Sequence, residues 1–119
     1  MGWLEIHPEP RFAALYAGLP GPFRTFVGHF DEVCALPAGW EVTARSRDCA
    51  IHGYLNEGLR VMGFQFHPEM DLEVGNVCYA RDREALERRG FDVGRILREA
   101  ADDGAGRVLF PRFLGWPWP

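Results

Sequence analysis

Val61–Glu69, which reads VMGFQFHPE, is the segment around which the rest of the chain can be interpreted. It begins as an apolar run that is too short for a helix of ordinary length. The run is rich in aromatic and branched residues, so it predicts a buried strand. The character of the chain changes at His67, where the run stops. Pro68 biases His67 away from the α region, and Glu69 follows two residues after the imidazole. The stretch therefore predicts a strand that ends in a histidine–carboxylate pair.

A histidine–carboxylate pair of this kind has two interpretations. The structural one is a surface turn, or a histidine that is hydrogen-bonded for packing reasons. The functional one is the general-base half of a nucleophilic triad, in which the acid holds the tautomer and orientation of the imidazole. Because ligands of α/β folds bind beyond the carboxyl ends of strands, the preceding strand favours the functional interpretation.

Length and composition limit the class of protein. A chain of 119 residues with 47% hydrophobic and 25% charged residues is typical of one globular domain, which we expect to span residues 1–119. The net charge of −4 argues against nucleic-acid or anionic-membrane partners. All 13 basic residues are arginines, which excludes a lysine nucleophile.

The chain lacks sequence signals for secretion, membrane insertion or metal binding. The first residues have neither a basic start nor an apolar core, and no apolar run is long enough to span a bilayer. Cys34, Cys49 and Cys78 are odd in number and lack CxxC spacing, so we expect no disulfide framework and no metal site. A cytoplasmic location is the resulting expectation.

Alternating apolar residues and turn signals predict five strands before the helices. These cover residues 2–7, 23–30, 40–46, 49–55 and 59–66. Asn56–Gly58 predicts a hairpin between the last two, and His52 is expected to be a packing residue of the first of them. The strand over 23–30 delivers His29 and Asp31 to its far end. We therefore expect a second polar strand end close to that of His67.

Helices are predicted mainly after Glu69. A helix of about two turns is expected over residues 11–17. A second is expected over 81–89, ended by Gly90, and a third begins with Asp92 as its N-cap and stops near Gly104. Pro111 argues against one long helix near the C-terminus.

Several blocks of the chain resemble those of the class I glutamine amidotransferase domain, in similar order and spacing. They are GHFDEV (28–33), LPAG (36–39), EVTARS (41–46), DCAI (48–51) and GFQFHPE (63–69). Residues 76–97 also resemble the C-terminal helices of some members. The likeness runs from about Trp3 onward and is to the C-terminal half of the domain. It implies a partial, flavodoxin-like α/β fold, with mixed strands and a hairpin followed by C-terminal helices.

The resemblance also implies a reaction. In that family a cysteine attacks the side-chain amide of glutamine, forms a glutamyl thioester and releases ammonia, and water then releases glutamate. His67 matches the histidine that activates the cysteine, and Glu69 matches the acid that orients it. His29, Phe30 and Asp31 match a loop beside the bound glutamine, where backbone groups hold the ends of the substrate. No cofactor is expected.

The chain departs from the family at the nucleophile. The family carries its cysteine in a Gly-x-Cys-x-Gly elbow, and none of Cys34, Cys49 and Cys78 has the flanking glycines that such a sharp turn needs. We therefore expect the 119 residues to supply the histidine–glutamate part of a Cys-His-Glu triad and to be inactive alone. A complementing N-terminal half or a partner from a synthase would complete the site.

Two other interpretations stay open. The chain could be a non-catalytic amidotransferase-like remnant that binds a partner, or a second copy of itself, through an exposed sheet edge. It could also be a hydrolase that uses one of its own cysteines, which would require a thiol of strongly lowered pKa beside His67. Another γ-glutamyl compound would use the same acyl chemistry as glutamine.

Overall fold

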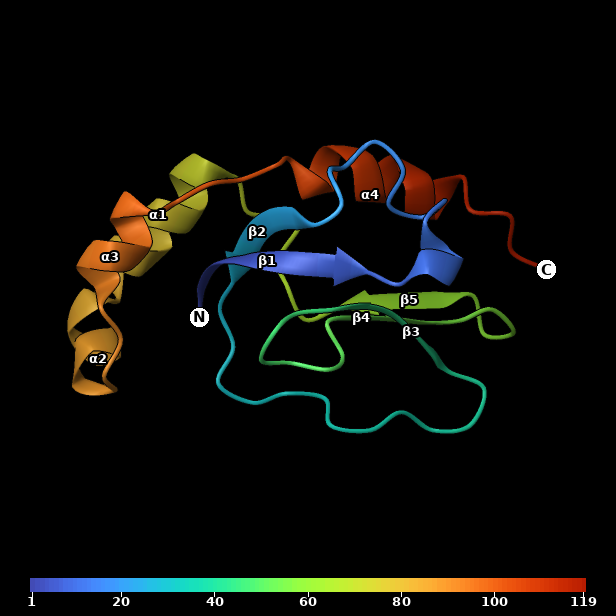
Figure 1. Ribbon diagram of the computed structural model, residues 1–119, viewed down its shortest axis with the longest axis horizontal. Coiled ribbons are helices and arrows are strands. Elements are labelled where there is room, and N and C mark those ends of the chain that lie inside the picture. The colour runs from blue at the N-terminus through green and yellow to red at the C-terminus, as the bar shows by residue number, and fades with distance from the viewer.

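The computed structural model describes all residues, 1–119, and contains one five-stranded sheet (Figure 1). Its strands are β1 (Gly2–Pro8), β2 (Phe23–Val27), β3 (Glu41–Arg45), β4 (Gly53–Asn56) and β5 (Val61–Phe64). The order across the sheet is β2-β1-β3-β4-β5, and all neighbours are antiparallel. β1 and β3 pair only at His7–Arg45 and Pro8–Ala44. This short pairing joins the β1–β2 ladder to the β3–β4–β5 ladders.

The helices lie in two places around this sheet. They are α1 (Leu72–Arg81), α2 (Arg83–Arg88), α3 (Val93–Arg98) and α4 (Ala105–Leu114), with a 3-10 turn at Pro10–Phe12. Figure 1 shows α1, α2 and α3 gathered at one end of the molecule, while α4 lies along the sheet. No helix is long and apolar enough to cross a membrane.

Two hydrophobic cores meet at β2 because its side chains alternate between the faces of the sheet. Phe23 and Val27 belong to the larger core, between the sheet and α4. Phe26 points to the other face and joins a smaller core that also contains Trp3 and Tyr79. This alternation confirms the pattern read from the sequence. It also places Phe26, a residue of β2, between the helices α1–α3 and the sheet.

Side-chain caps start two of the helices. The Asp92 carboxylate accepts a hydrogen bond from the backbone N–H of Arg95, which confirms the predicted N-cap of α3. Asp71 caps α1 in the same way through Val74. Gly90 follows α2 with a φ of 89°, a conformation that favours glycine.

Four details differ from the sequence-based expectations. The helix expected over 11–17 is only the turn Pro10–Phe12. The helices after the sheet begin at Leu72 rather than near residue 81, so Cys78 lies inside α1. β5 is an edge strand that is half-buried at most, because only one neighbouring strand covers it. α4 continues through Pro111, where the packing of Ala105 and Leu109 in the larger core offsets the hydrogen bond that proline cannot donate.

Replacement of Tyr79 by phenylalanine should destabilise the fold without changing its shape. The Tyr79 hydroxyl accepts a hydrogen bond from Gly2 N at 2.7 Å and donates one to Val27 O at 2.6 Å. The variant leaves both buried backbone groups unpaired, so the free energy of unfolding should fall by about 1–3 kcal/mol in urea titrations. Tyr54→Phe, at a half-buried ring beside Trp40, is the control and should change it by less than about 0.5 kcal/mol. Equal losses in the two variants would contradict the role of the hydroxyl.

Candidate active site

The histidine–carboxylate pair expected after β5 is present as a hydrogen-bonded unit. His67 Nδ1 lies 2.8 Å from Glu69 Oε1, and the two side chains are 38% and 52% exposed. With its Nδ1 proton donated to the carboxylate, the imidazole carries its lone pair on Nε2. The pair can therefore take a proton from a group that approaches Nε2 and return it later.

The chain around His67 is held by contacts that orient the imidazole. The backbone N–H of His67 donates to Phe26 O at 2.9 Å, which ties the segment after β5 to β2. The Phe26 ring stands edge-on to the imidazole, with ring centroids 5.6 Å apart. The preceding residue, Phe66, is buried in the larger core. His67 thus sits on an anchored backbone while its side chain keeps an open face.

The loop after β2 lies next to this segment, as the sequence predicts. His29 Nδ1 lies 2.8 Å from the carbonyl oxygen of Asp31, so the imidazole bridges across the loop. The backbone N–H of Val33 donates to the Gln65 side-chain oxygen at 2.9 Å, which connects the loop to the strand that leads to His67. These contacts bring the two polar strand ends together.

The side chain of Phe30 is turned toward the helices. Its ring lies beneath the Arg89 guanidinium, 4.1 Å from the ring centroid, and 6.2 Å from the ring of Phe91. The Phe30 side chain nevertheless remains 56% exposed.

The three cysteines differ in burial and in hydrogen bonding. Cys34 is exposed and Cys78 is partly buried in α1. Cys49 is buried, and its Sγ is hydrogen-bonded to Gln65 and Ile51. Burial raises the pKa of the Cys49 thiol, which is the opposite of what an attacking thiolate requires. The geometry therefore disfavours the interpretation as a self-contained hydrolase based on Cys49.

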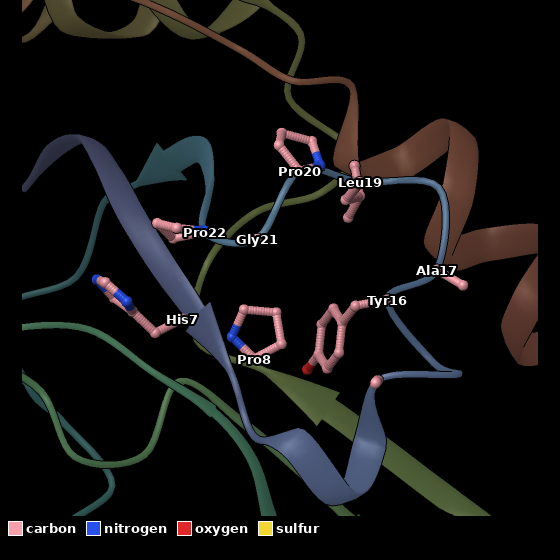
Figure 2. Close-up of a pocket in the computed structure, with 9 residues that line it drawn as sticks. His7, Pro8, Tyr16, Ala17, Leu19, Pro20, Gly21 and Pro22 are labelled. Atoms are coloured by element: carbon pink, nitrogen blue, oxygen red, sulfur yellow. The ribbon is translucent and has the colours of Figure 1, made fainter.

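The surface also has a pocket at a different place. Figure 2 shows it between the end of β1 and the segment that follows it, with Tyr16, His7 and three prolines at its walls. None of the predicted site residues lines it. A shallow hollow beside Glu69, with Asp71, Arg107 and Phe110 in its wall, lies closer to the histidine–carboxylate pair.

Two features of the site escaped the sequence interpretation. Gln65 connects the two strand ends, and only its place in the GFQFHPE block could have indicated this role. His29, Cys49 and His52 also meet, with one potential ligand atom of each lying within 4.8 Å of the others. No local spacing reveals this group, because it comes from two separate connections of the sheet.

A comparison with protein families shows the family of the chain. The sequence model described as "Glutamine amidotransferase class-I" matches residues 4–83, which include the histidine–carboxylate pair and the loop after β2. The chain belongs to the class I glutamine amidotransferase family. The family expected from the sequence blocks is thereby confirmed.

Curated relatives of this amidotransferase chain are GMP synthases. The chain is 44% identical to the glutamine-hydrolysing GMP synthase of Listeria innocua over 69 residues. This aligned segment makes up 58% of this chain and 13% of that protein. It is 41% identical to a glutamine-hydrolysing GMP synthase subunit of Thermococcus kodakarensis over 56 residues. This second aligned segment makes up 47% of this chain and 30% of that protein. The chain thus spans less than a third of either relative.

Solved amidotransferase structures share the fold. A glutamine amidotransferase from Thermotoga maritima matches with a TM-score of 0.75 at 21% identity, over 96% of this chain and 50% of that protein. A putative GMP synthase subunit from Thermoplasma acidophilum matches with a TM-score of 0.63 at 20% identity, over 97% of this chain and 42% of that protein. The expected α/β amidotransferase-type fold is confirmed by these matches.

Proposed function

We propose that this chain supplies the histidine–glutamate part of a Cys-His-Glu triad that hydrolyses the side-chain amide of glutamine to glutamate and ammonia. The observation that carries the proposal is the His67–Glu69 hydrogen bond of 2.8 Å on an open face at the end of β5. His67 Nε2 would take the thiol proton of the attacking cysteine and deliver it to the leaving ammonia. Glu69 would hold the tautomer and stabilise the imidazolium that forms.

The cysteine would come from a segment outside these 119 residues, where it would sit in the Gly-x-Cys-x-Gly elbow of the family. Residues 29–31 would hold the α-amino and carboxylate ends of glutamine through their backbone groups. The support is that Gln65 and the Phe26 carbonyl already join this loop and β2 to the His67 segment. Glutamine, rather than another γ-glutamyl compound, is proposed because the Listeria innocua relative is named as glutamine-hydrolysing.

The partner would be a complementing amidotransferase segment or a synthase subunit. The Thermococcus kodakarensis relative is itself named as one subunit of a synthase, which supports such an assembly. Pairing of two copies through a sheet edge remains a prediction, and β5 is the edge to test. The other edge, β2, is occupied by Asp103, which accepts from Arg24 N at 2.6 Å and donates its own N–H to Arg24 O at 3.0 Å.

A segment exchange tests the proposed function directly. Residues 4–83 of this chain would replace the corresponding segment of the Listeria innocua GMP synthase, and ammonia and glutamate release from glutamine would be measured. We expect the hybrid to hydrolyse glutamine, whereas the purified 119-residue chain alone releases no ammonia. A folded hybrid that binds glutamine but never hydrolyses it would favour the non-catalytic binding module. Activity of the chain alone that requires one of its own cysteines would contradict the proposal.

A further inference from the structure

The side chains of His29, Cys49 and His52 form a cluster that the proposed glutaminase reaction does not use. One potential ligand atom from each lies within 4.8 Å of the other two. His29 follows β2, whereas Cys49 and His52 lie in the connection between β3 and β4. The imidazole centroids of His29 and His52 are 5.4 Å apart. The fold therefore brings two imidazoles and a thiol together from two separate connections.

The hydrogen bonds of His29 leave one nitrogen ready to bind a ligand. Its Nδ1 faces the Asp31 carbonyl oxygen at 2.8 Å, and a carbonyl can only accept, so Nδ1 carries the proton. The lone pair then lies on Nε2, which is buried and has no hydrogen-bond partner. A histidine that binds a metal commonly donates its other N–H to a backbone carbonyl in this way.

His52 presents a second nitrogen without a partner. The residue is 1% exposed, and its Nδ1 is buried without a hydrogen bond. A buried polar atom in this state is costly unless something satisfies it, and a cation bound at Nδ1 would do so.

The surroundings of Cys49 complete the donor set. Its Sγ accepts from Gln65 Nε2 at 3.3 Å and lies 3.4 Å from Ile51 O. A bound cation ionises a coordinating thiol, and a water molecule can provide an oxygen as the fourth ligand. Two nitrogens, one sulfur and one oxygen form a set that suits tetrahedral zinc.

We propose that His29, Cys49 and His52 bind one Zn²⁺ ion, with water as the fourth ligand. Ligand atoms of tetrahedral zinc lie about 3.3–3.8 Å apart, so small side-chain rotations from the present spacing close the site. The ion fastens the loop after β2 to the β3–β4 connection. It therefore stabilises the position of the loop that contains residues 29–31. Binding of the ion does not depend on the proposed glutaminase activity.

Cobalt and zinc titrations of the purified chain test the site. After removal of metal with a chelator, Co²⁺ should bind 1:1 and give the near-ultraviolet charge-transfer band of a cobalt–thiolate bond. Zn²⁺ should displace it and raise the thermal unfolding temperature. Cys49→Ser should abolish the band, and His52→Gln and His29→Gln should each weaken Zn²⁺ binding by at least about 100-fold.

Matched controls separate this site from other thiols and imidazoles. Cys34→Ser removes an exposed thiol, and His7→Gln removes a half-exposed imidazole, and both should leave the band and the affinity unchanged. Circular dichroism checks that each variant is folded, and His29→Gln, at the least buried of the three ligands, serves if the buried variants do not fold. A Co²⁺ complex without the thiolate band, or Zn²⁺ affinity unchanged by His29→Gln, would overturn the proposal.

Discussion

Replacing His67 with alanine should lower glutamine hydrolysis of the hybrid enzyme by about 10²–10⁴-fold, because the variant removes the group that moves the proton. The side chain is 38% exposed, so the fold should tolerate the change. Loss of a proton-transfer group should appear in kcat rather than in KM. Steady-state measurement of ammonia release, with binding of glutamine measured separately, checks both parts of this expectation.

The chain contains a matched control for this variant. His7 and Glu5 are also two residues apart, with His7 Nε2 3.1 Å from Glu5 Oε1, and their side chains are 48% and 57% exposed. His7→Ala should therefore leave activity unchanged, because this pair lies on β1, away from the His67 segment. Glu69→Gln should cause a smaller loss than His67→Ala, since it disturbs orientation but keeps the imidazole. Equal activity of the His67→Ala and His7→Ala hybrids would contradict the role of His67.

Gly106→Ala should destabilise the chain by about 1–3 kcal/mol, although alanine is the better helix former. A methyl group at this position of α4 would collide with the backbone carbonyl of Pro68, which cannot move aside as a flexible side chain can. The helix or the turn between His67 and Glu69 must shift to make room. Chemical denaturation of the 119-residue chain should report the loss of stability.

A second helical glycine provides the control. An added methyl group at Gly94 of α3 would meet the Arg98 guanidinium at 3.1 Å, at the end of a side chain that can rotate, and the Asp92 carboxylate at 3.4 Å, an ordinary van der Waals distance. Gly94→Ala should therefore be neutral, or stabilising by up to about 1 kcal/mol. Similar destabilisation of both variants would show that the close approach of α4 to Pro68 has no special effect.

The sequence interpretation was most accurate where neighbours along the chain control the structure. The alternation of side chains in β2 and the N-cap at Asp92 each depend on residues only a few positions apart in the sequence. The structure confirms both. It was least accurate where packing competes with local preference. Pro111 disfavours a helix locally, yet α4 passes through it because its apolar face packs on the larger core.

The sequence by itself determined the family, the strand that leads to His67 and the presence of Glu69 two residues later. Only the tertiary structure decided that the Phe26 carbonyl holds His67, that Gln65 holds the loop after β2, and that His52 lies beside His29. The physical reason is the distance along the chain. A local pattern specifies the conformation of its own segment, whereas contacts between distant segments depend on strand order and on the packing of both cores.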